Sequence, residues 1–316
     1  MKMPRLSLLA FALLVSGFSL GFMHTRADEF PEDTNTIETL TVEQARKLAR
    51  PKVLQSLPGV EVPEERLELQ LNFLTTLDAE TAEALAEFKG RILYLNGLTT
   101  IDAESAAALA SFKGDYLFLD GLTTVSDEVA RALAQHKNHL SLQGLTTLSD
   151  EAAAALAQQR GLLFLDGLTT LSDEAAKALG KHEGNLHLNG LTTLSDKAAE
   201  MLVPHRGLVF LNGLTTLSEE VAKSLVRLRN GGLYLDGLTT LSDAVAQTLT
   251  QHKGNLSLKG LDSLEPAAAE SLVKGLDCRR CHADVSTPDL LNKECRGLDP
   301  RRRILLTRGI TVEPGR

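Results

Sequence analysis

A four-residue motif that recurs at an almost constant interval most constrains the fold of this chain. The motif Gly-Leu-Thr-Thr occurs seven times, beginning at Gly97, Gly121, Gly144, Gly167, Gly190, Gly213 and Gly237. Degenerate copies begin at Phe73 and Gly260, and the shared Leu recurs every 23 or 24 residues. A period of this size over nine copies predicts an array in which each unit packs against its neighbours.

The unit from Leu163 to Gly184 predicts a strand, a turn, a short helix and a loop. Residues 163–166 alternate apolar and other side chains, as expected of a strand with one buried face. Ser172 is expected to cap a helix that has an acidic first turn and an Ala-rich body. Gly184 is expected to end that helix.

One such unit cannot bury its apolar face alone, so neighbouring units are expected to stack Leu on Leu and pair their strands in parallel. The predicted fold is therefore an α/β repeat, a solenoid of about nine to ten strand–turn–helix units. We assign residues 1–27 to a signal peptide, 28–65 to an N-terminal cap with a partial repeat, and 66–274 to the array. Residues 275–316 form a Cys-containing, Arg-rich tail that is expected to be poorly ordered.

The first 27 residues have the pattern of a secretory signal peptide. Lys2 and Arg5 precede an apolar stretch, and Thr25-Arg26-Ala27 offers small residues for cleavage. The alternative is a retained membrane anchor, but an apolar stretch of about 17 residues broken by Gly and Ser is at the short limit for a spanning helix. Cleavage predicts an exported protein, periplasmic, in the cell envelope or secreted, without a stable membrane span.

Two strand leucines separated by one residue, such as Leu163 and Leu165, recur from unit to unit. Through this motif residues 36–274 resemble the leucine-rich repeat family, whose repeat lengths include 23 and 24 residues. The resemblance implies a horseshoe that presents its strand face to partners. The family usually has Asn or Cys three residues after the second strand Leu, where this chain has Leu168. We therefore expect the Thr169-Thr170 pair to satisfy the backbone of the turn.

Two columns of residues alternate with the strand leucines and are predicted to face solvent. We expect their aromatic and acidic members to bind a protein or glycan of the cell envelope. These members are Tyr94, Phe118, Phe164, His187, Phe210 and Tyr234 in the first column, and Asp120, Asp166 and Asp236 in the second. The alternative is that aromatic and polar ladders only stabilise a parallel sheet.

Charge and composition argue against several other functions. The formal net charge of -8 argues against a nucleic-acid partner. Ser, Asp and His recur as part of the repeat without forming a nucleophile–base set, so we expect no catalytic residue and no enzyme. The recurring histidines are His136, His182, His205 and His252. Because they skip units, we expect them to be cations near helix ends rather than a metal site.

The segment Cys278-Arg279-Arg280-Cys281-His282 matches the attachment motif of c-type haem. In such a site the thiols of Cys278 and Cys281 bond the haem, and His282 ligates the iron. Only 34 residues follow His282, and none is a Met or His that could complete the iron coordination. The alternatives are a disulfide, a zinc site that includes Cys295, or the remnant of a lost domain. We therefore expect no cofactor, with covalent haem c and electron transfer as the alternative.

Overall fold

The computed structural model of the 316-residue chain describes residues 34–49, 68–228, 231–275, 304–306 and 311–312. Its contacts divide the chain into residues 1–33 and 34–316, and only the second unit contains described residues. The predicted signal peptide, the motif at 278–282 and Cys295 lie outside the described residues.

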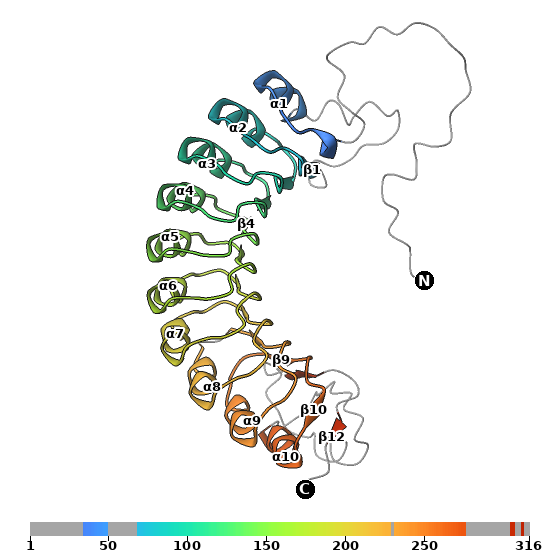
Figure 1. The fold of residues 1–316 in the computed structure, drawn as a ribbon, viewed down its shortest axis with the longest axis vertical. Helices are drawn as coiled ribbons and strands as arrows, with labels where there is room; N and C mark the ends of the chain where they lie inside the picture. Colours follow the sequence, from blue (N-terminus) through green and yellow to red (C-terminus); the bar gives the residue numbers. More distant parts are fainter. Residues whose placement is uncertain (1–33, 50–67, 229–230, 276–303, 307–310, 313–316) are drawn as a thin grey trace, which may run out of the picture. The chain divides into compact units, whose positions relative to one another are not determined.

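Short parallel strands alternate with short helices through the described part of the chain (Figure 1). The strands of the main sheet are β1 (Glu68–Gln70), β2 (Ile92–Tyr94), β3 (Tyr116–Phe118), β4 (His139–Ser141), β5 (Leu163–Phe164), β6 (Leu186–His187), β7 (Val209–Phe210), β8 (Leu233–Tyr234), β9 (Leu256–Leu258) and β11 (Ile304–Leu306). The helices are η2 (Thr34–Thr36), α1 (Val42–Ala49), α2 (Ala79–Ala86), α3 (Ala103–Ala110), α4 (Asp127–Leu133), α5 (Asp150–Leu156), α6 (Asp173–Leu179), α7 (Asp196–Leu202), α8 (Glu219–Leu225), α9 (Asp243–Leu249) and α10 (Pro266–Gly275). Consecutive units pair their strands in parallel, which confirms the predicted α/β solenoid.

Leucine forms the core between the strands and the helices. The register places Leu163 of β5 beside Leu140 of β4 and Leu186 of β6, so strand leucines stack from unit to unit. Leu168 of the recurring motif and Leu179 of α6 are also fully buried. Burying a Leu side chain stabilises a fold by about 1.5 to 3 kcal/mol. A single unit would leave these side chains in water, so its stability comes from the neighbours on either side.

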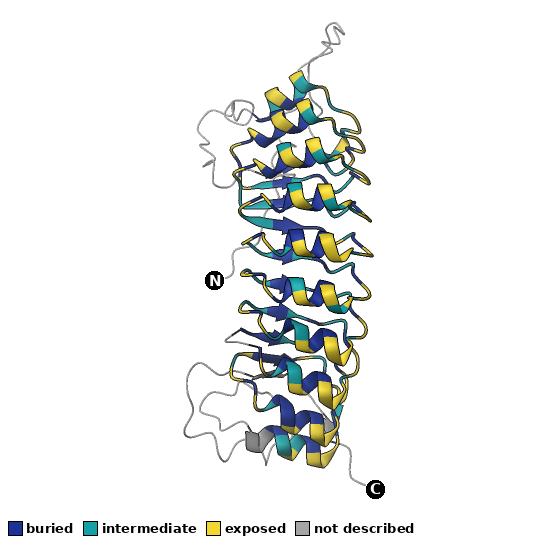
Figure 2. Cartoon of the chain, turned by 90° about the vertical axis from the view of Figure 1, so that its left-hand side faces the viewer, coloured by how far each residue is buried: buried dark blue, intermediate teal, exposed yellow. Residues whose placement is uncertain are grey.

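Helices and strands form two layers of the array. In Figure 1 the helices follow the outer side of the curve and the strands follow the inner side. Figure 2 views the helix side, where exposed residues mark the outward face of each helix. Alanine dominates the inward helix faces: Ala175 and Ala176 of α6 are at most 1% exposed. Because Ala is small, the helix backbone can lie close to the leucine layer.

Serine caps determine where most of the helices begin. The Ser172 Oγ accepts a hydrogen bond from the Ala175 N–H at 3.0 Å, which confirms Ser172 as the N-cap of α6. Its hydroxyl also donates to Asp150 at the start of the preceding helix. The same contact recurs one unit later, where Ser195 donates to Asp173 at 2.9 Å. The caps are therefore connected from unit to unit.

The prediction that Gly184 ends this helix is wrong. Helix α6 ends at Leu179, and Gly180 is its C-cap in the right-handed helical conformation. Gly184 is required by the close approach of two loops, because a Cβ there would lie 1.7 Å from a carbonyl oxygen of the preceding unit. Gly167 of the recurring motif meets the same limit, with its Cβ position 2.2 Å from the carbonyl oxygen of Gln143.

The two ends of the array differ from the middle. Before α1, Gln44 Oε1 accepts from the backbone N–H of Thr41 at 2.9 Å, while the Thr41 Oγ1 accepts from the Gln44 N–H at 3.3 Å. These two bonds form a capping box. At the other end, β11 pairs with β9, and β12 (Thr311–Val312) pairs with β10 (Ser263–Leu264). The rest of residues 276–316 lies outside the described ranges, so the order of the predicted tail stays a prediction.

Candidate functional site

The solvent-facing side of the strand layer carries a continuous row of rings. From β5 to β8 the residue after the first strand Leu or Val is Phe164, His187, Phe210 and Tyr234, and each pairs in register with the next. Their neighbouring ring centroids lie 4.2, 4.0 and 4.2 Å apart. All four side chains are partly exposed. These four residues are termed the aromatic ladder.

A second, shorter group of rings covers β2 to β4. Tyr94 stacks on Phe118 with ring centroids 4.6 Å apart. Tyr116 lies 5.9 Å from Phe118 and 4.5 Å from His139. Tyr116 and His139 lie outside the binding face that the sequence predicts. Tyr116 stands two residues before Phe118, and this spacing places both side chains on one face of a strand and could have identified it.

Ser141 separates the two groups of rings and is buried. Its Oγ donates to Asp120 Oδ1 at 2.5 Å and accepts from Gln143 Nε2 at 3.1 Å. Ser257 follows the aromatic ladder in the same column, and its Oγ donates to Asp236 Oδ1 at 2.5 Å. Both serines therefore bond to the neighbouring polar column.

Stacking determines which part of each ring can meet a partner. The ring plane of His187 makes an angle of 33° with that of Phe164 and 12° with that of Phe210. Rings at this spacing cover one another's faces, so the ladder presents mainly ring edges to solvent. Burial among these rings lowers the pKa of His187, and the charge of Asp166 acts in the opposite direction. An uncharged imidazole therefore continues the ladder at neutral pH.

The predicted acidic column forms hydrogen bonds with the backbone of the next unit. Asp166 Oδ1 accepts from the N–H of Asn189 at 2.9 Å, and Asn189 Oδ1 accepts from the N–H of Asn212 at 3.1 Å. Asp120 and Asp236 each accept a backbone N–H in the same way. These acceptors satisfy backbone donors where each strand ends. The three aspartates therefore have a structural role at the side of the aromatic rows, and a contact with a partner stays a prediction.

The role predicted for the Thr169-Thr170 pair also differs from the structure. Thr169 and Thr170 are both exposed. The turn is closed by the Leu168 N–H, which donates to the carbonyl oxygen of Leu165 at 3.2 Å, and the adjoining donor of the next unit bonds to Asp166. The prediction that the threonines supply the hydrogen bonds of this turn is wrong, because Asp166, the residue before Gly167, already accepts from the backbone there.

The recurring histidines are buried core residues, which corrects their prediction as cations near helix ends. The exposed fraction is 1% for His136, His182 and His205, and 4% for His252. In the preceding unit Phe112 takes the same position, and its ring stacks on His136 with centroids 6.2 Å apart. Burial lowers the pKa of His136 and His182 and lowers that of His205 to about 4. These three side chains are therefore uncharged imidazoles at neutral pH.

The described ranges contain neither a cluster of metal ligands nor a membrane-spanning helix. These ranges contain no group of three or more His, Cys, Asp and Glu side chains that could hold a metal ion. None of their helices is long and apolar enough to cross a membrane. Because Cys278, Cys281 and His282 lie outside the described ranges, haem attachment stays a prediction from the sequence.

Comparison with known proteins gives similarity at the level of solved structures. No protein-family model matches the chain, and no curated protein matches its sequence. The chain is similar to an internalin of Listeria monocytogenes, with a TM-score of 0.35 and 14% identity over 84% of this chain and 89% of that one. It is also similar to an LRR protein of Leptospira interrogans, with a TM-score of 0.28 and 20% identity over 66% and 70% of the two chains. At these values the fold assignment rests on the strand pairing and repeat geometry described above.

Proposed function

We propose that this protein is a non-enzymatic scaffold that binds a protein partner through the aromatic ladder. The observation that carries the proposal is the unbroken stack of four partly exposed rings across adjacent strands. Aromatic side chains are enriched at the centres of protein interfaces and supply much of their binding energy. The stacked rings are already ordered, so binding would cost little side-chain entropy.

Ring stacking also favours a protein over a glycan as the partner. Sugars commonly bind aromatic side chains by lying over the ring face, and in the ladder the inner ring faces are covered by neighbouring rings. The exposed edges instead form a narrow apolar strip, flanked on one side by the column of Asp and Asn side chains. Such a strip fits apolar side chains with polar neighbours, which is the chemistry of a protein surface.

The test compares proteins captured by the wild-type chain with those captured by Phe164→Ala/Phe210→Ala. Extracytoplasmic protein fractions are passed over each immobilised chain at equal density. Phe73→Ala is the matched control, because Phe73 is 56% exposed and lies outside the ladder. We expect the wild type and the control to retain the same protein, and the double variant to lose it while keeping a wild-type circular dichroism spectrum.

Equal capture by all three chains would contradict the proposal. Protease treatment of the captured fraction separates the two partner classes: a partner that survives complete proteolysis but is removed by glycosidases would be a glycan. That result would keep the strand face as a binding surface but would reject the argument from covered ring faces.

We also propose that the protein acts outside the cytoplasm. The support is the pattern of residues 1–27, which has a basic start, an apolar stretch and a small-residue cleavage site. N-terminal sequencing of the protein from an export-competent host tests this directly, with Asp28 expected as the first residue. An unprocessed N-terminus in the membrane fraction would indicate a retained anchor.

Covalent haem on Cys278 and Cys281 stays the alternative, and it would make the array a docking arm for electron transfer. An absorption spectrum of the protein from a haem-maturing host tests it. A Soret band that survives denaturation and is lost in Cys281→Ala would establish haem attachment. A spectrum without such a band leaves the binding scaffold as the proposed function.

A further inference from the structure

Most of the described loops between a helix and the next strand carry a basic residue at one recurring position. Among the described residues this position has six basic members, which we term the basic ridge: Lys89, Lys113, Lys137, Arg160, Arg206 and Lys253. All six are exposed, and Glu183 takes this position in one unit. Lys89, Lys113, Lys137 and Arg160 lie on consecutive units, so neighbouring residues of these four are separated by roughly one strand spacing of about 4.8 Å. Arg206 and Lys253 each follow two units later. An acidic chain of net charge -8 therefore has one edge along which cations align.

The helix dipole does not account for the ridge. Cations stabilise a helix within its last turn, and the effect falls off beyond that turn. The last turns of α2, α3, α5, α7 and α9 contain no basic residue. The ridge residues that follow these five helices stand three or four positions beyond the final helical residue. These residues therefore lie in the loops, too far beyond the helix ends for their charges to stabilise the helices.

Ion pairing within the chain does not account for the ridge either. Arg160 lies 3.9 Å from the carboxylate of Glu183, and both side chains are more than 70% exposed. The other five ridge residues form no ion pair with another described residue within 4.0 Å. In contrast, Asp127 and Asp173 at the helix starts accept hydrogen bonds from serine caps. Among the described residues, five of the six charges on this edge are therefore not neutralised by an ion pair.

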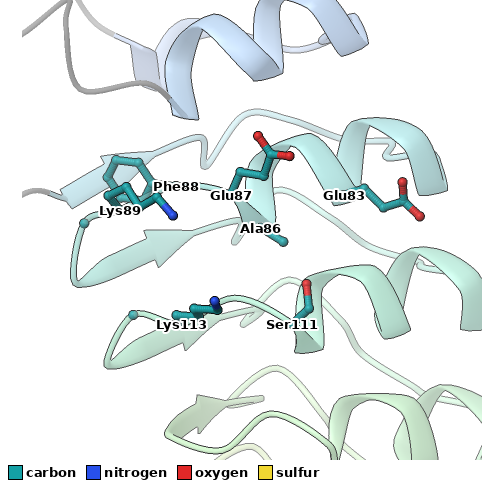
Figure 3. Close-up of a pocket in the computed structure, with 9 residues that line it drawn as sticks. Glu83, Ala86, Glu87, Phe88, Lys89, Ser111 and Lys113 are labelled. Carbon is teal, nitrogen blue, oxygen red and sulfur yellow. The ribbon is translucent and has the colours of Figure 1, made fainter.

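Two surface hollows lie along this edge at equivalent places in the repeat. The first, of about 280 Å³, is lined by Lys89 and Lys113 together with Glu83 and Glu87 of α2 and its C-cap. Figure 3 shows the two lysines on consecutive loops with their side chains extending in the same direction. The second hollow, of about 450 Å³, is lined by Arg160, Lys181 and Glu183 among others. The edge is therefore both charged and recessed between units.

We propose that the basic ridge binds an unbranched acidic polysaccharide that carries one carboxylate per sugar. From Lys89 to Arg160, single cations about 5 Å apart fit a polymer whose charges recur roughly once per sugar ring. Duplex DNA is a poorer fit, because it presents one charge per about 1.7 Å and would bring that dense charge close to an acidic body. This surface is distinct from the aromatic ladder, so the proposal does not depend on the partner of the strand face.

The test measures binding of the full chain to immobilised polygalacturonate between 50 and 200 mM NaCl. We expect log Kd to rise linearly with log salt concentration, as counterion release requires. Lys113→Ala/Lys137→Ala should weaken binding and lower this slope by about 2, since each lost contact removes about 1. Lys177→Ala/Lys223→Ala is the matched control, because it removes the same charge from lysines that pair with glutamates on the outer helix faces. The control should retain the wild-type slope.

Glu183→Lys provides a gain-of-function arm that misfolding cannot imitate. It fills the interruption in the ridge and releases Arg160 from its acidic neighbour, so the salt slope should increase by about 1 and binding should tighten. Three results would overturn the proposal: no binding at 50 mM NaCl, equal losses in the ridge and control variants, or unchanged binding in Glu183→Lys. Tighter binding of a DNA duplex at equal charge concentration would reject the polysaccharide as the occupant.

Discussion

Acid should destabilise the array through its buried histidines, and His205 offers the sharpest case. Its side chain is 1% exposed, and neither ring nitrogen has a hydrogen-bond partner among the described residues. The ring of His182 stacks beside it with centroids 6.1 Å apart. Burial is the main reason that the pKa of His205 falls from 6.5 to about 4, and the neighbouring His182 adds to the effect.

The sign and size of the effect follow from proton binding in the two states. The unfolded chain takes up the proton near pH 6.5, whereas the folded chain takes it up only near pH 4. Between these values the unfolded state holds more protons, so stability is intact above pH 6.5 and is lost as the pH falls toward 4. At about 1.4 kcal/mol per pKa unit, His205 alone accounts for about 3 kcal/mol of this loss.

The perturbation is His205→Gln, because the array already contains glutamine at this position. Gln159 is the equivalent residue of an earlier unit, is 1% exposed, and donates to the carbonyl oxygen of Asn138. Glutamine carries no charge at any pH in this range. The free energy of unfolding of the variant, relative to that of the wild type, should therefore increase by about 2 to 3 kcal/mol between pH 7.5 and pH 4.5. Urea unfolding followed by far-ultraviolet circular dichroism at both pH values measures it.

The reverse substitution, Gln159→His, is the matched control and should make the chain more sensitive to acid. Carboxylates contribute equally to the wild type and to both variants, so their titration cancels in the comparison. If the stability of wild type and His205→Gln followed parallel curves from pH 7.5 to 4.5, burial of the neutral imidazole would not be the source of acid sensitivity. A constant difference between the two stability curves would show that the substitution changes packing and not proton binding.

Three further changes probe the contacts that recur between units, each measured by urea unfolding. Asp166→Ala should lower the free energy of unfolding by about 1 to 2 kcal/mol, because it leaves the Asn189 N–H without its acceptor. Asp166→Asn keeps an acceptor oxygen and should retain most of that stability. Equal losses in the two variants would contradict a stabilising role for this hydrogen bond. Ser172→Ala should lower the free energy of unfolding by about 1 to 2 kcal/mol by removing the N-cap of α6, whereas Ser172→Asp should preserve the cap. An alanine variant as stable as the wild type would contradict a stabilising role for this cap. Gly184→Ala should cost at least about 2 kcal/mol, because its Cβ would overlap a backbone carbonyl oxygen of the preceding unit. A Gly184→Ala chain as stable as the wild type would refute the close approach.

Features that depend on residues within one unit could be predicted from the sequence. The alternation at residues 163–166 predicted the strand, and Ser172 before an acidic turn predicted the helix start, because both signals act over a few neighbouring residues. The period of 23 or 24 residues then required parallel pairing, since identical units can stack only in register. The same period predicted which leucines are buried.

Features that depend on contact between units were missed or misassigned. Gly184 has the local context of a helix stop, yet the atom that excludes a side chain there belongs to the preceding unit. His182 follows a helix end, where a cation is favoured locally, but the stacked neighbouring units bury it and lower its pKa. Aspartate is a residue type usually found at the surface, but the carboxylate of Asp166 accepts a hydrogen bond from the backbone N–H of Asn189, 23 residues later. In each case the deciding atom lies one repeat away.

This nearest-neighbour coupling also explains why the strand face is divided into two groups of rings. Ser141 interrupts the ring column, and in the same unit Gln143 replaces the Asp or Asn of the polar column and directs its amide to Ser141. Because a ring in a parallel stack is positioned by the rings on either side, a single small residue ends one row and lets another begin. The aromatic ladder from Phe164 to Tyr234 then spans four strands, or roughly 15 Å. A partner that binds this ladder as proposed need not contact the ring group on β2 to β4, because Ser141 separates the two groups.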